Sequence, residues 1–148
     1  MKTQPKILNW KFPKFDSNGM TQWFWMCQHH KNLILGNYID IGAFTYINAL
    51  YGITLGDYVQ IGSHCSIYSV STIDKKKGPV YVGQYAKIGT HSTVMPGIKI
   101  GKHALIGAYS FVNKNIPDGV LAFGIPIRVV RKLTEEELSI HRDEYSIL

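Results

Sequence analysis

The strongest constraint on the fold of this chain is a six-residue period in its aliphatic side chains. The period runs in three blocks, which begin at Leu35, Leu55 and Val82. Its members are Leu35, Ile41, Ile47, Leu55, Ile61, Ile67, Ile73, Val82, Ile88, Val94, Ile100, Ile106 and Val112. A period of six fits neither an α-helix, with about 3.6 residues per turn, nor a simple hairpin meander. It predicts a solenoid with one short strand and one turn in every hexad.

Glycine directly follows eight of these thirteen aliphatic positions, where a background of about 7% would give roughly one. We expect the aliphatic residue to point inward and the glycine to let the chain turn where side chains would crowd. A small or apolar residue usually recurs four positions after the aliphatic one, and we expect it to point inward too. These residues are Thr45, Val59, Cys65, Ser71, Ala86, Ser92, Ala104 and Ser110.

Three hexads would close one triangular coil, and coils gain stability by stacking on their neighbours. The count predicts a β-helix over residues 35–117, with coils at 55–72, 82–99 and 100–117. Residues 35–54 form an earlier coil with a short excess near Ala49–Gly52. Residues 73–81 carry three lysines and do not fit inside a coil, so we expect an insertion loop that projects outward. Such loops often carry function.

The two flanks of the repeat differ from it. Residues 1–34 hold all three tryptophans and are predicted to form an aromatic N-terminal capping segment that packs on the open end of the solenoid. A contribution to a substrate pocket is the alternative. Residues 118–148 form a C-terminal extension, in which Thr134 and Glu137 have the spacing of a capping box. We expect a short α-helix there that ends at about Tyr145.

Composition excludes several classes of protein. The sequence has 148 residues and is 45% hydrophobic, but no apolar run reaches the roughly 18 residues of a membrane span. We therefore expect one cytoplasmic domain. The net charge of +6 comes without a recognition helix or RNA-binding signature, so we expect no nucleic-acid partner. Cys27 and Cys65 lack metal-type spacing and are predicted to be free buried thiols.

Three motifs accompany the hexads: Met95-Pro96-Gly97, Asn115-Ile116-Pro117-Asp118 and Gly124-Ile125-Pro126. With them, about residues 35–132 resemble the C-terminal half of hexapeptide-repeat acyltransferases. The resemblance implies an all-β fold, a left-handed parallel β-helix. The left hand follows from the resemblance and not from the period, since crossover connections are right-handed in about 98% of cases.

The resemblance also implies a function. Such enzymes are homotrimers that bind acetyl-CoA along a groove between two subunits, with the acceptor at the insertion loop and no metal. The piece CSIYSVSTIDKKKGPVYVG is most similar to small bacterial enzymes that acetylate an amino group of a nucleotide-linked sugar for cell-surface polysaccharide or O-antigen. The alternative is O-acetylation of a sugar or small-molecule hydroxyl.

Two histidines are candidate catalytic residues. His64 and His91 both occupy the tenth place of their coils, so we expect them on one outward face, about 4.8 Å apart. Histidine is the natural base near neutral pH. The alternative is that both are merely outward polar residues or part of a trimer interface. His103 occupies the fourth place and is expected on another face.

The insertion departs from the family pattern. Many relatives place a catalytic histidine there, and the matching stretch 69–74 has none. Asp74 or Ser71 would then bind the substrate by orienting its amine, although Asp74 also suits a simple turn.

The cofactor residues follow from the resemblance alone. It implies backbone contacts to acetyl-CoA from Gly107 and Ala108, with the adenine end near Pro126. The same end carries Arg128, Arg131 and Lys132, which would neutralise the phosphates or form only a solvated tail.

Two other classes remain open. A γ-type carbonic anhydrase has a β-helix with zinc held by three histidines, but the repeat face here offers only His64 and His91. A non-catalytic scaffold or ice-binding solenoid is the second alternative. Ice binding needs flat threonine ladders, whereas the outward places here are mixed.

Overall fold

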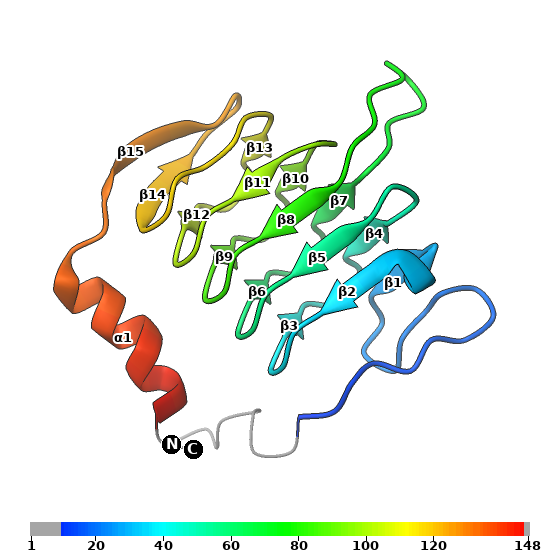
Figure 1. The fold of residues 1–148 in the computed structure, drawn as a ribbon, viewed down its shortest axis with the longest axis horizontal. Helices are drawn as coiled ribbons and strands as arrows, with labels where there is room; N and C mark the ends of the chain where they lie inside the picture. The colour runs from blue at the N-terminus through cyan, green and yellow to red at the C-terminus, as the bar shows by residue number, and fades with distance from the viewer. Residues whose placement is uncertain (1–9, 147–148) are drawn as a thin grey trace.

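The computed structural model describes residues 10–146, with side chains up to residue 140. Short parallel strands wind into a left-handed β-helix of triangular cross-section, and a single α-helix follows them in the described part of the chain (Figure 1). The predicted fold class is confirmed. None of the helices among the described residues is long and apolar enough to cross a membrane.

Three sheets form the three faces of the prism, because every third strand from β1 to β13 stacks in the same sheet; β14 and β15 then extend the third sheet. The first sheet holds β1 (Met26–Gln28), β4 (Tyr46–Asn48), β7 (Ser66–Tyr68), β10 (Thr93–Val94) and β13 (Phe111–Val112). The second holds β2 (Leu33–Leu35), β5 (Ile53–Leu55), β8 (Val80–Val82) and β11 (Lys99–Ile100). The third holds β3 (Asp40–Ile41), β6 (Gln60–Ile61), β9 (Lys87–Ile88), β12 (Leu105–Ile106), β14 (Val120–Phe123) and β15 (Arg128–Lys132).

The strand register stacks aliphatic residues directly on one another. Ile47 pairs with Ile67, Ile67 with Val94, and Val94 with Val112. All four side chains are fully buried, and each such burial stabilises the fold by about 1.5–3 kcal/mol. The hexad period therefore produces one continuous hydrophobic column inside the prism.

Small residues fill the inner corners as predicted, with one exception. Thr45 and Ser110 are buried because their hydroxyls donate to the carbonyls of Gly62 (2.9 Å) and Gly107 (2.6 Å). Ser71 does not point inward: it is half-buried in the insertion loop, and Ser69 is buried instead. The chain leaves the coil earlier than the period indicates.

The turn glycines lie where side chains would crowd, as expected, but the left-handed φ belongs to other residues. The left-handed φ occurs two residues after each glycine, at bulky side chains such as His64 and His91 (both 57°). The glycines instead lie where neighbouring coils touch. A Cβ on Gly62 would lie 2.7 Å from the amide nitrogen of Thr90. Close approach between coils, and not a special φ, requires glycine there.

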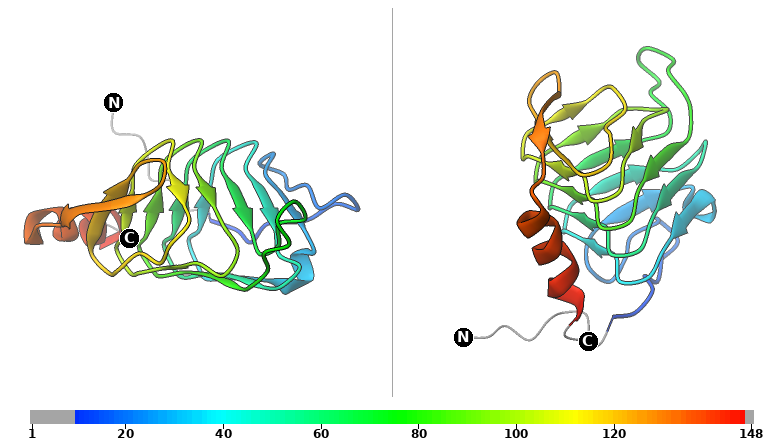
Figure 2. Two further views of the ribbon diagram at one scale, coloured as in Figure 1. Left: turned by 90° about the horizontal axis from the view of Figure 1, so that it is seen from above. Right: turned by 60° about the vertical axis from the view of Figure 1, so that its left-hand side comes forward.

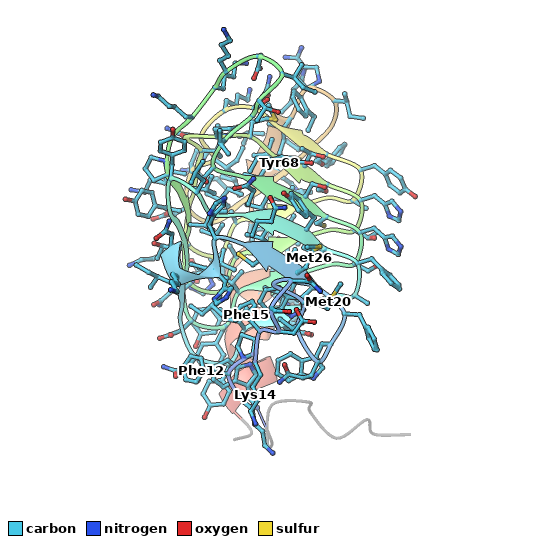
Figure 3. All side chains as sticks on the ribbon, turned by 90° about the vertical axis from the view of Figure 1, so that its right-hand side faces the viewer. Phe12, Lys14, Phe15, Met20, Met26 and Tyr68 are labelled. Carbon is cyan, nitrogen blue, oxygen red and sulfur yellow. The ribbon has the colours of Figure 1, made fainter. Side chains whose placement is uncertain are left out.

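The parallel ladder begins before residue 35. Strand β1 lies in the predicted capping segment and pairs in parallel with β4. Phe15 and Met20 lie just beyond Met26, at the open end of the coil (Figure 3). Phe15 packs edge-on against the buried ring of Trp25, with centroids 5.6 Å apart.

The segment between β7 and β8 projects away from the prism (Figures 1 and 2). It is a small hairpin, in which Ser71 N–H donates to the Lys76 carbonyl at 2.8 Å. Ile73 keeps the six-residue spacing but is 95% exposed, because it lies on this hairpin and not in a coil.

At the C-terminal end the chain leaves the parallel ladder. Strand β15 pairs antiparallel with β14. Helix α1 (Glu135–Ser146) then runs back in the direction of the N-terminal coils (Figure 2). The capping box is present: Glu137 N–H donates to Thr134 Oγ1 at 3.2 Å, and Thr134 N–H donates to Glu137 Oε2 at 2.9 Å.

Candidate active site

Rings line two edges of the prism, because the left-handed turn residues of successive coils lie one above another. We call the edge between the third and first sheets the histidine edge, made of Phe24, Phe44, His64, His91 and Tyr109. All five of these side chains are exposed. The edge between the second and third sheets is the tyrosine edge, made of Tyr38, Tyr58, Tyr85 and His103. Figure 3 shows a row of rings projecting from one side of the coil.

The two candidate catalytic histidines lie together on the histidine edge. Their ring centroids are 4.7 Å apart and the planes are 4° from parallel, which matches the expected spacing of one coil. Tyr109 stacks on the other face of His91 at 4.9 Å. The ring of His91 is therefore stacked between His64 and Tyr109.

Thr90 distinguishes the two histidines. Its Oγ1 lies 2.9 Å from His91 Nδ1 and 2.7 Å from the carbonyl oxygen of Ser63. Among the side chains that the structure describes, no group forms a hydrogen bond with the ring of His64. His91 is thus the histidine whose orientation is fixed. We did not identify Thr90 from the sequence, where its only signal is its place beside His91.

The candidate cofactor turn Gly107-Ala108 lies on the same edge. It leads from β12 into Tyr109, whose amide donates to the Thr90 carbonyl at 2.9 Å. The turn therefore lies one coil beyond His91. The candidate catalytic histidine and the candidate cofactor turn therefore lie in one line along this edge.

The turn that contains Pro126 continues this line. The Gly124 carbonyl accepts from Phe111 N–H at 2.9 Å, and the Gly124 amide donates to Ser110 Oγ at 3.2 Å. The turn thus stacks on the residues that follow Tyr109. Pro126 is exposed there.

The three predicted phosphate ligands lie on β15, and all are exposed. Arg131 is already paired: its guanidinium makes two hydrogen bonds with the Glu137 carboxylate, at 2.9 and 2.8 Å. These bonds raise the pKa of Arg131 above its usual value. The carboxylate offsets the charge, so Arg128 and Lys132 are better placed to meet an anion.

Asp74 and Ser71 occupy the third edge of the prism, on the projecting loop. The Ser71 hydroxyl is the main cause that lowers the pKa of Asp74, with further help from Lys76, whose ammonium lies 3.3 Å from the carboxylate. Asp74 is therefore an ionised hydrogen-bond acceptor. Strands β7 and β10 separate it from the histidines of the same chain.

Both cysteines are free and buried, as predicted. Burial raises the pKa of Cys27 to about 12 and also raises that of Cys65. A protonated buried thiol is a poor nucleophile, so neither residue suits covalent catalysis.

Two further features of the described residues bear on ligands. The side chains described, up to residue 140, include no group of three or more His, Cys, Asp or Glu residues that could hold a metal ion. A surface hollow of about 330 Å³ is lined by Ser17, Asn18, Gly19, Cys27, Gln28, His29 and His30. It belongs to the N-terminal end and includes none of the candidate site residues.

Comparison with known proteins identifies the repeat. Residues 79–114 match the family model "Bacterial transferase hexapeptide (six repeats)". The galactoside O-acetyltransferase of Escherichia coli K12 is 32% identical over 127 residues, which cover 76% of this chain and 63% of that protein. The chain thus spans less than two thirds of this relative.

Solved structures share the fold. A galactoside acetyltransferase in complex with coenzyme A superposes with a TM-score of 0.65 at 25% identity, covering 77% of this chain and 61% of the other. The N-acyltransferase AntD of Bacillus cereus, in complex with dTDP and 3-hydroxybutyryl-CoA, gives a TM-score of 0.69 and covers 86% of both chains. At 18% identity it supports the fold alone. The chain therefore carries the repeat of the bacterial hexapeptide transferases and shares the fold of the solved galactoside acetyltransferase.

Proposed function

We propose that this protein transfers an acetyl group from acetyl-CoA to a sugar. The observation that carries the proposal is the histidine edge, where the oriented imidazole of His91 lies in line with the turns at Gly107-Ala108 and Pro126. The name of the Escherichia coli relative, a galactoside O-acetyltransferase, and the coenzyme A bound to the solved galactoside acetyltransferase support the same reaction.

The chemistry needs one base. The acceptor oxygen or nitrogen attacks the thioester carbonyl while its proton passes to the imidazole of His91. The C–S bond then breaks, and the leaving CoA thiolate takes the proton from the imidazolium. His64 lies against the ring of His91 and contacts the acceptor in this proposal.

Acetyl-CoA would lie along the histidine edge towards the C-terminal end. Backbone groups of Gly107 and Ala108 bind its pantetheine arm, and the adenine end lies at Pro126. Arg128 and Lys132 neutralise phosphates, while Arg131 does so only after exchange of its Glu137 partner.

The acceptor is proposed to be the amino group of a nucleotide-linked sugar. The projecting loop supports this, because its ionised Asp74 can orient an amine and its lysines suit a diphosphate. A sugar hydroxyl is the second candidate. The relative's O-acetyltransferase activity favours it, and so does the fixed orientation of His91, since a hydroxyl needs a base more than an amine does.

A site that combines the loop with the histidines requires more than one chain. Asp74 and His64 lie on different edges of the same prism, so the Asp74 loop of one chain would meet the histidine edge of another. We therefore propose a homotrimer, with the site at each subunit interface.

A release assay for free CoA thiol tests the function. The purified protein should consume acetyl-CoA with either nucleotide-linked amino sugars or galactosides, and the productive panel identifies the acceptor group. His91→Ala should lower the rate by about 10²–10⁴-fold, with smaller losses for His64→Ala and Asp74→Asn. No CoA release with any acceptor would overturn the proposal.

His103 offers a matched control. It has the same left-handed backbone (φ 59°) and stacks on Tyr85 at 4.9 Å, but it lies on the tyrosine edge. His103→Ala should keep the activity of the unmodified protein. An equal loss in His103→Ala and His91→Ala would indicate a structural effect.

A further inference from the structure

The hydroxyl of Thr90 determines which nitrogen of His91 carries the proton. Thr90 Oγ1 has one hydrogen and lies 2.7 Å from the Ser63 carbonyl oxygen, which can only accept. Two oxygens at this distance repel unless a hydrogen lies between them. The Thr90 hydrogen is therefore directed at Ser63.

The remaining contacts of Oγ1 must then be accepted by its lone pairs. His91 Nδ1 lies 2.9 Å away and has to be the donor, so Nδ1 carries the hydrogen. The Ser63 hydroxyl, at 3.3 Å, can donate to the same oxygen. The neutral imidazole consequently has its lone pair on Nε2, and the side chain is exposed to solvent.

The backbone holds this arrangement rigidly. His91 N–H donates to the same Ser63 carbonyl at 3.1 Å, and the imidazole is stacked between His64 and Tyr109. Both the ring plane and the direction of Nδ1 are thereby fixed. At the equivalent places on this edge Ser63 also carries a hydroxyl, whereas Ala43, two coils before Thr90, and Ala108, one coil after it, do not.

We propose that Thr90 is a positioning residue that keeps His91 in the Nδ1–H tautomer, so that Nε2 accepts the proton of the acceptor sugar. The inference rests on the proposed function for its catalytic part. The tautomer itself is a property of the free protein and requires no substrate.

The first test is nitrogen NMR of the histidine rings near neutral pH. The unmodified protein and Thr90→Ser should show His91 protonated at Nδ1, whereas Thr90→Val should shift it towards Nε2–H. The valine is nearly isosteric and the serine keeps the hydroxyl, so the pair separates the hydrogen bond from packing. An unmodified protein with Nε2–H, or a Thr90→Val variant with an unchanged tautomer, overturns the inference.

The second test is kinetic. Thr90→Val should lower kcat by about 10- to 100-fold, as loss of an orienting partner does elsewhere, with the KM for acetyl-CoA unchanged and activity restored in Thr90→Ser. A full kcat in Thr90→Val refutes the positioning role. An unmodified protein that releases no CoA instead refutes the proposed function, while the NMR result still decides the tautomer.

Discussion

Two glycines in neighbouring coils should respond oppositely to the same substitutions. A Cβ on Gly62 would lie 2.7 Å from Thr90 N and 2.9 Å from Thr90 Cα. These are backbone atoms of the next coil, so they yield little. Overpacking costs about 1–3 kcal/mol, and the rigid neighbour places Gly62→Ala near the upper value. A protein of this size would lose roughly 2–4 °C in Tm for each kcal/mol.

Gly97 is the matched comparison. It has a left-handed φ of 78° and no heavy atom within 4 Å of its hypothetical Cβ. Gly97→Ala therefore costs only the left-handed backbone penalty, about 1–2 kcal/mol. Asparagine tolerates that conformation, so Gly97→Asn should cost less than Gly97→Ala. At Gly62 asparagine adds atoms to a filled gap and should cost more than alanine.

Urea denaturation followed by far-UV circular dichroism, with Tm from calorimetry, measures all four variants. The expected ranking is reversed between the two sites: alanine is the better tolerated residue at Gly62 and asparagine at Gly97. A Gly62→Asn variant as stable as Gly62→Ala would contradict this ranking, because the gap between coils would then not be filled.

Three further changes test local electrostatics and capping. Burial raises the pKa of Cys27 from 9.0 to about 12, so its contribution to stability is complete below pH 9 and is lost as the pH rises towards 12. Cys27→Ala should therefore flatten the fall of the unfolding free energy at alkaline pH. An equally steep fall in the variant and the unmodified protein would contradict this. Ser71→Ala should raise the pKa of Asp74 towards its usual value, since that hydroxyl is the largest cause of the lowering; an unchanged midpoint in a carbon NMR titration would argue against it. Thr134→Ala should lower the free energy of unfolding by about 0.5–2 kcal/mol and speed amide exchange in the first turn of α1. Thr134→Ser should keep the cap. Equal exchange rates in the two variants would show that the cap is unimportant.

The inward side of the fold was predictable, because burial repeats with the coil. Ile47 and Ile67 are buried as the period requires. Ser71 was placed wrongly, since spacing cannot show where the coil ends and the hairpin begins. The parallel strand β1 was also missed: the residues around Cys27 have no glycine hexads, and their burial depends on pairing with β4.

The site was predictable only to the level of position. The number of residues between His64 and His91 is one coil plus the insertion, so their stacking followed from counting. The role of Thr90 depends on where a single hydrogen points, which spacing cannot reveal. The pairing of Arg131 with Glu137 depends on β15 reversing its direction, and the repeat contains no information on that reversal.

The way the coil ends has a consequence for assembly. Parallel strands present open N–H and C=O groups at each end, and such edges can template the growth of fibrils. Here Ile116 bridges to Ile100, Gly124 accepts from Phe111, and β14 is paired by the antiparallel β15. A second copy arriving end to end at this side meets a hairpin in place of a matching ladder. The closure therefore ends the column of stacked coils at this side of the prism.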